Sequence, residues 1–162
     1  MEMPETEFIE GALSLRKLRL PSDTQLTKRG LVRWCALSLG LISPGETRLS
    51  ILSILDSLLY YGFRNREAQI DELKDYIANK SVFKNEMNEK TLRYHLTQLK
   101  KDRLVHGKRG KFALIRNPFS DEVGEGITYW MDLNSKEIGE RIKRGMDYIK
   151  KAYQGDINAG GN

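Results

Sequence analysis

Hydrophobic positions divide the first part of the chain into helical segments. Residues 24–39 predict one helix, because apolar positions become dense toward its end and Gly40 is typical of a left-handed C-cap. The Ser-Pro-Gly-Glu sequence at 43–46 predicts the start of the next helix, with a capping Ser and a Pro at the first helical position. That helix runs to about Tyr61 and is apolar on most sides, so we expect it at the centre of the core.

Shorter elements follow. Residues 68–70 predict a brief strand and residues 72–78 a short helix. Asn88 is placed to cap a further helix over 89–101, whose leucines recur at spacings of four and three and define an inward face. Residues 104–115 then read as a β-hairpin with a basic tip bounded by glycines.

The C-terminal part has a weaker pattern. Residues 127–133 predict a strand or extended segment, and Asn134 with Glu137 indicates the start of a last helix that reaches about Tyr153. Residues 154–162 are expected to form a disordered tail. Apolar and small residues recur along the last helix in the alternating spacing of a short coiled coil: Ile138, Ile142, Gly145, Ile149 and Ala152.

These elements predict a mainly helical α+β protein with four parts. Residues 1–46 form an N-terminal arm and helix that pack on the core or on a dimer partner. Residues 47–116 form a domain in the order helix, strand, helix, helix, hairpin, which is the order of a winged helix. Residues 117–153 form the C-terminal extended segment and helix, a candidate for dimerisation, and residues 154–162 form the tail.

The charge of the chain is concentrated in one region. The 162 residues are 40% hydrophobic and carry a formal net charge of +5. Residues 80–116 hold 11 basic and 3 acidic side chains, a net charge of +8, whereas the flanking regions 1–79 and 117–162 are slightly acidic. The excess lies on the predicted helix 89–101, its approach and the hairpin, which makes this region a candidate surface for an anionic partner.

Other classes of protein find little support. The single cysteine, Cys35, excludes an intrachain disulfide framework and a multi-cysteine zinc site, and it is expected to be a small buried residue. His95 lies beside inward-facing leucines with no second ligand-rich segment, so we expect no metal. The chain has no phosphate-binding glycine loop and no recognisable nucleophile arrangement. We therefore expect neither an enzyme nor a cofactor.

The chain shows no targeting or membrane-spanning pattern. Its acidic first residues lack the basic and then apolar order of a signal peptide. The apolar stretches 31–42 and 49–61 are interrupted by charged residues and are shorter than the roughly 20 residues that span a bilayer. A cytoplasmic protein with no membrane contact is expected.

Residues 91–105, Thr-Leu-Arg-Tyr-His-Leu-Thr-Gln-Leu-Lys-Lys-Asp-Arg-Leu-Val, resemble the recognition-helix segment of winged helix-turn-helix transcription regulators of the ArsR and MarR kind. Residues 70–73 resemble the short strand and second-helix start of that family. The resemblance covers about 70 of the 162 residues. It departs from the family at Arg103, where a Gly is common before the Leu-Val, and in a longer connection before the helix.

A winged helix places its third helix in the major groove of DNA and its hairpin on the neighbouring backbone. Helix positions that point outward supply groups for base edges and phosphates, and the hairpin tip supplies cations for phosphates or a narrow minor groove. The candidate DNA-binding residues are Asn88, Lys90, Thr91, Arg93, Tyr94, Thr97, Gln98 and Lys101 on the helix and Lys108, Arg109 and Lys111 on the hairpin.

The sequence therefore predicts a transcription regulator that binds double-stranded DNA, in keeping with the resemblance. Such regulators usually form homodimers, and the candidate dimer surfaces are the helix with Ile138, Ile142 and Ile149 and the helix with Trp34. Two alternatives stay open. One is a winged-helix protein-interaction module in a replication or transcription assembly, and the other is a nonspecific nucleic-acid binder or replication initiator.

Overall fold

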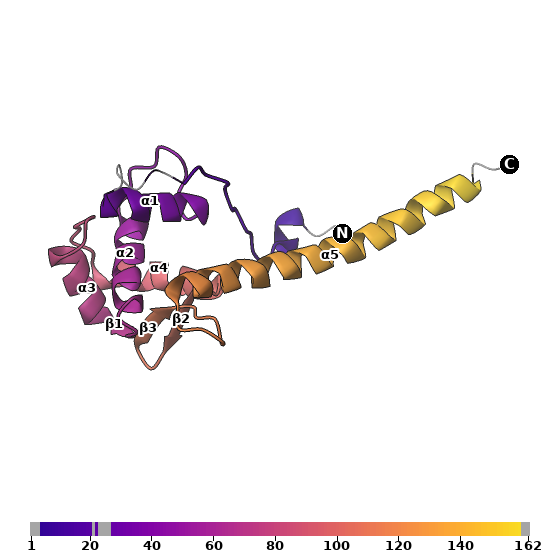
Figure 1. Cartoon of the computed structure of the whole chain (residues 1–162). Helices are drawn as coiled ribbons and strands as arrows, with labels where there is room; N and C mark the ends of the chain where they lie inside the picture. The colour runs from indigo at the N-terminus through magenta and orange to yellow at the C-terminus, as the bar shows by residue number, and fades with distance from the viewer. Residues whose placement is uncertain (1–3, 21, 23–26, 160–162) are drawn as a thin grey trace.

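The computed structural model describes residues 4–20, 22 and 27–159. The protein is a mixed α+β structure, as predicted, in which helices and a small antiparallel sheet form a body from which one long helix extends (Figure 1). The elements are η1 (Glu5–Phe8), α1 (Lys28–Ser38), α2 (Ser50–Gly62), β1 (Ala68–Gln69), α3 (Ile70–Asn79), α4 (Glu89–Lys101), β2 (Val105–Lys108), β3 (Lys111–Leu114) and α5 (Val123–Ala159). Residues 24–26 of the predicted first helix lie outside the described part of the chain.

The sheet has the order β1-β3-β2, and both pairings are antiparallel. Strands β2 and β3 are joined by Arg109 and Gly110, which have φ angles of 55° and 75°. A two-residue turn with both residues at positive φ matches the twist of the strands that it joins. The predicted hairpin and the predicted strand at 68–70 are therefore confirmed, and the pairing of β1 with β3 fixes the hairpin to the body.

Helix α2 lies at the centre of the core, as its apolar pattern predicts. Leu52, Ile54, Leu55 and Leu58 are fully buried. Helices α1, α3 and α4 and strand β3 all pack against α2. Residues 52–58 are all buried, so the polar residues Ser53, Asp56 and Ser57 of this helix also lie inside the core.

The predicted start of α2 at residues 43–46 is wrong. The Glu46 carboxylate does accept a hydrogen bond from the Ser43 N–H at 2.9 Å, as in a capping box. However, Gly45 has a φ of 77°, which ends the turn before helical geometry can propagate, and α2 begins only at Ser50. The local capping signal therefore describes an isolated turn.

The C-terminal predictions are also wrong in two places. Residues 127–133 are not extended, and residues 154–159 are not a tail, because one helix of 37 residues covers both segments. Ile127, Trp130 and Met131 contact the core at helical spacing, and Gly126 lets α5 approach the preceding chain, since a Cβ there would lie 2.2 Å from the carbonyl oxygen of Ile115. This packing outweighs the low helix propensity of the local glycines. Residues 160–162 lie outside the described part.

The N-terminal arm crosses the end of α1. The guanidinium group of Arg16 donates hydrogen bonds to the carbonyl oxygens of Leu37 and Ile42, at 2.9 and 2.6 Å. Leu37 lies in the last turn of α1, and Ile42 lies in the connection between α1 and α2. The arm thereby fastens the turn between α1 and α2. None of the described helices combines the length and hydrophobicity needed to cross a bilayer.

Candidate nucleic-acid interface

Helix α4 begins after Asn88 and buries its leucines, as predicted. The side-chain oxygen of Asn88 accepts a hydrogen bond from the Thr91 N–H at 2.8 Å and so caps the helix. Leu92, Leu96 and Leu99 are buried against the body. The remaining positions therefore point outward, and the cap fixes where they start.

The outward face of α4 carries every predicted helix residue. Thr91 is half-buried and the others are exposed: Asn88, Lys90, Arg93, Tyr94, Thr97, Gln98 and Lys101. We call this set, with Thr91, the polar face of α4. Its members can offer hydrogen-bond donors, cationic groups and one aromatic ring to a partner.

Two members of the polar face are already engaged inside the helix, which the sequence analysis did not anticipate. Arg93 donates from Nε and Nη2 to the same carboxylate oxygen of Glu89, at 2.8 Å in each case. The Thr97 hydroxyl donates to the carbonyl oxygen of Arg93 at 2.8 Å. The contact occupies the Nε–Nη2 edge of the guanidinium group, so Arg93 can turn that edge to an external acceptor only if the contact with Glu89 is given up. The spacing of four between an acid and a base was the signal that could have revealed this pair.

Tyr94 and His95 are packed edge to face, with ring centroids 5.5 Å apart. Tyr94 is 61% exposed, so most of its side chain faces solvent. His95 is half-buried, and burial, with a smaller contribution from the charge of Arg48, lowers its pKa. A neutral His95 supports Tyr94 without adding charge to the polar face.

The hairpin tip concentrates cations. Lys108 and Lys111 are directly paired across β2 and β3, and Arg109 occupies the turn between them. All three are exposed, and they take part in none of the ion pairs found among the described residues. Like charges directly opposite each other destabilise a hairpin. An anionic partner at the tip would remove that repulsion.

A further group of cations lies where β1 meets the hairpin. Arg66, Lys111 and Arg116 line an open cavity of about 640 Å³, together with Glu67 and Glu72. Arg66 forms an ion pair with Glu72, at the start of α3. The sequence analysis missed Arg66 and Arg116, because only the pairing of β1 with β3 brings them beside Lys111.

The approach to α4 is held by a buried carboxylate. Asp56 of α2 is 1% exposed and accepts hydrogen bonds from the hydroxyl groups of Tyr76 and Ser81, at 3.1 and 2.7 Å, and from the Val82 N–H at 3.1 Å. Lys28 of α1 donates to the Tyr76 hydroxyl at 3.1 Å. Asp56 therefore anchors the long connection that precedes Asn88.

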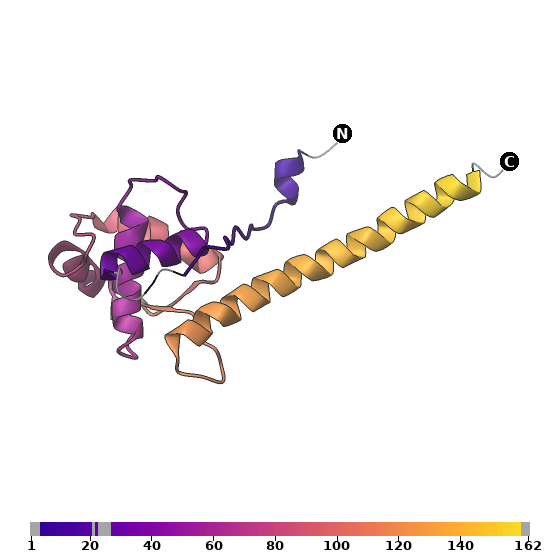
Figure 2. The same ribbon diagram turned by 45° about the horizontal axis from the view of Figure 1, so that its top comes forward.

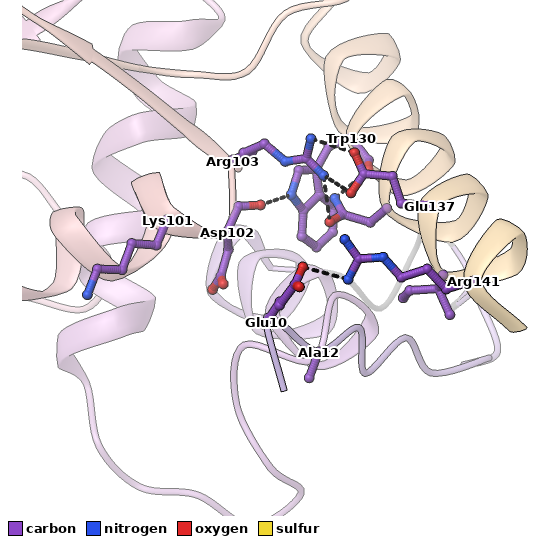
Figure 3. A pocket seen from close by; sticks show the side chains of 11 residues that line it. Glu10, Ala12, Lys101, Asp102, Arg103, Trp130, Glu137 and Arg141 are labelled. Carbon is purple, nitrogen blue, oxygen red and sulfur yellow. Dashed lines mark hydrogen bonds and ion pairs between the residues drawn. The ribbon is translucent and has the colours of Figure 1, made fainter. Parts of the chain in front are cut away.

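The exit from α4 is joined to α5 and to the N-terminal arm (Figure 3). Arg103 has a φ of 63° and makes a two-pronged ion pair with Glu137, and the Trp130 indole N–H donates to the carbonyl oxygen of Asp102 at 2.6 Å. Glu10 of the arm pairs with Arg141 at 2.6 Å. The turn after α4 thus tolerates Arg103 in the left-handed conformation for which a Gly is usual.

Within residues 4–20, 22 and 27–159, no three metal-ligating side chains of the His, Cys, Asp or Glu type come together. Cys35 is half-buried in an apolar region, and burial raises the pKa of its thiol, which disfavours the reactive thiolate.

Comparisons of the chain with known protein families, with curated proteins and with solved structures found no match.

Proposed function

We propose that the chain is a winged-helix regulator of transcription that binds double-stranded DNA in the cytoplasm as a homodimer. The order α2-β1-α3-α4-β2-β3 and the sheet order β1-β3-β2 support the winged-helix assignment. The observation that carries the proposal is the arrangement of cations: the polar face of α4 and the hairpin tip follow each other in a region with a net charge of +8.

In this proposal α4 enters the major groove and the hairpin acts as the wing. The width of the groove admits one α-helix, and an outward arginine can pair with the edge of a guanine. Arg93 would exchange its carboxylate partner Glu89 for that edge. Lys108, Arg109 and Lys111 would contact phosphates, which position the protein without reading sequence. The cluster of Arg66 and Arg116 beside Lys111 would extend the backbone contact.

A titration with different nucleic acids tests this function. Duplex DNA from the upstream region of the protein's own gene, random duplex, single-stranded DNA and RNA are compared at several salt concentrations. We expect a preferred duplex whose affinity falls steeply with salt, since each neutralised phosphate releases counterions. No duplex binding at low salt would exclude the proposal.

Nonspecific nucleic-acid binding is the second candidate, and the pairing of Arg93 with Glu89 favours it. If that ion pair persists in the complex, the Nε–Nη2 edge of Arg93 stays occupied and fewer of its donors can read a base, so the hairpin cations contribute a larger share of the affinity. The same titration separates the two functions. Nonspecific binding predicts equal affinity for all duplex sequences with a similar salt dependence.

A further inference from the structure

The N-terminal arm is anchored to the body through its later residues. The Arg16 N–H donates to the carbonyl oxygen of Ser38 at 3.0 Å, in addition to the two hydrogen bonds from its guanidinium group. The Trp34 indole N–H donates to the carbonyl oxygen of Arg19 at 2.9 Å. The stretch from Arg16 to Arg19 is therefore held on the body by four hydrogen bonds.

The part of the arm that precedes this anchor reaches α5. The Glu10 carboxylate pairs with Arg141 at 2.6 Å, and no other hydrogen bond or ion pair in the described part of the chain joins the arm to α5. The two side chains are 68% and 57% exposed. An ion pair in solvent is weak and is screened by salt. The arm thus combines a firm anchor with an end contact that can open.

The same ion pair is the outermost hold on α5. Trp130, Asn134, Glu137 and Arg141 recur at spacings of four, three and four, which places them on one face of the helix. The first three bind the turn that follows α4, and only Arg141 binds the arm. Beyond Arg141, no hydrogen bond or ion pair among the described residues joins α5 to another element. Figures 1 and 2 show this part of α5 leaving the body in a straight line.

A polar cavity of about 240 Å³ lies between the three elements (Figure 3). Its walls are residues 10–12 of the arm, residues 101–103 at the end of α4 and the face of α5 that carries these contacts. Six of its 11 lining residues are charged, so the space suits water and not apolar packing. A close-packed core would resist any movement of the helix, whereas a polar cavity leaves α5 room to tilt.

We propose that the arm from Glu10 to Arg19 is a strap that sets the tilt of α5. When the strap is closed, the ion pair of Glu10 with Arg141 holds α5 at a point about 16 Å beyond Trp130 along the helix. When the strap is open, α5 is held only at its first turns and at the turn after α4. Salt opens the strap, because it screens an exposed ion pair. The strap requires no nucleic acid, so it stands or falls apart from the proposed DNA-binding function.

Distances between pairs of spin labels in the full-length chain test the strap, without nucleic acid and in a Cys35→Ala background. Labels at Thr6→Cys and Gln154→Cys report the distance between the arm and α5, and labels at His106→Cys and Gln154→Cys report the distance between the sheet and α5. The three positions are exposed. We expect narrow distance distributions at low salt and broader ones at high salt. Distributions that do not change with salt would overturn the proposal.

Substitutions show whether the ion pair itself closes the strap. Glu10→Arg removes the ion pair and should raise the ratio of open to closed molecules about two- to fivefold at low salt, which broadens both distributions. Glu10→Arg combined with Arg141→Glu restores an ion pair of reversed polarity and should make the distributions narrow again. Glu7→Arg is the matched control. It makes the same change in charge on the arm at an exposed residue outside the ion pairs of the described chain, and it should leave both distributions unchanged.

The outcomes of these variants decide the proposal. Unchanged distributions in Glu10→Arg, or equal broadening in Glu7→Arg, would show that the contact of Glu10 does not hold α5. Broad distributions in the doubly substituted chain would show that the ion pair is not the cause of closure. Circular dichroism should give the same helix content for every variant, because a strap changes the tilt of α5 and not its folding. Broadening accompanied by a loss of helix content would contradict the proposal.

Discussion

The guanidinium group of Arg103 donates two hydrogen bonds, of 2.9 and 2.8 Å, to the carboxylate of Glu137. Arg103 occupies a backbone conformation with a φ of 63°, which a residue with a Cβ rarely adopts. The hydrogen bond from Arg103 is the main cause of the lowered pKa of Glu137. The turn after α4 therefore combines backbone strain with an ion pair to α5. A glycine at position 103 would relieve the backbone strain, but it would also remove the ion pair with Glu137.

Substitutions at Arg103 separate these two effects. Arg103→Gly and Arg103→Ala both lose the ion pair, but only the alanine retains the strain. We expect Arg103→Ala to have a free energy of unfolding about 1 kcal/mol lower than Arg103→Gly. Urea denaturation of the two variants measures the difference. Equal stabilities would show that the turn relaxes to a different conformation without the arginine.

Releasing Arg93 should strengthen binding to DNA if the proposed function is right. Glu89→Gln removes the carboxylate that holds the Arg93 guanidinium. We expect affinity for the preferred duplex to rise by about two- to fivefold, the range of an exposed ion pair. Fluorescence anisotropy at fixed salt provides the measurement. Glu86→Gln, an exposed control with the same change in charge, should give a smaller increase. Equal increases would mean that net charge alone matters.

The buried carboxylate of Asp56 should be essential for stability. Asp56→Asn presents an amide group where the structure has an acceptor for Ser81 and Val82, so one buried donor loses its partner. We expect the free energy of unfolding to fall by about 2–4 kcal/mol. Hydrogen exchange at the Val82 N–H should also become faster. Asp75→Asn, an exposed control on α3, should change neither quantity; similar losses in both variants would contradict the role assigned to Asp56.

His95 should make the protein less stable in mild acid. Burial is the main cause that holds its pKa in the folded state below the ordinary value of 6.5. As the pH falls below 6.5, the unfolded chain binds a proton at His95 that the folded state still excludes, so the free energy of unfolding decreases. Urea denaturation at about pH 7.5 and 5.5 should show a smaller decrease for His95→Gln than for the wild type. An equal decrease in His95→Gln and the wild type would contradict this role of His95.

The features that the sequence predicted well depend on nearby residues. Asn88 caps α4 because its side chain reaches the backbone of Thr91, three residues later. The hairpin turn at Arg109 and Gly110 requires only two residues with positive φ. The burial of α2 follows from its wide apolar surface, which several elements must cover together. Each of these signals lies within one element.

The features that were missed depend on distant contacts or on competition between local signals. Residues 43–46 have a capping sequence, but Gly45 ends the turn. The start of α5 is hidden by Gly124 and Gly126, and packing of Trp130 on the body stabilises the helix in spite of them. Arg66 and Arg116 come together only through the pairing of β1 with β3. The contact of Arg93 with Glu89 could be predicted from their spacing of four residues, and it occupies one edge of the Arg93 guanidinium group.

The attachment of α5 to the end of α4 has a mechanical consequence. The Trp130 indole and the Arg103 guanidinium fix the first turns of α5 to the residues that terminate α4. A 37-residue helix is about 55 Å long and bends little, so it behaves as a lever with its pivot at this attachment. From Glu137 to Ala159 the helix is about 33 Å long, so a tilt of about 5° at the attachment displaces its far end by about 3 Å. A contact that fixes the direction of α5 therefore also fixes the orientation of α4, through the attachment at Trp130 and Arg103.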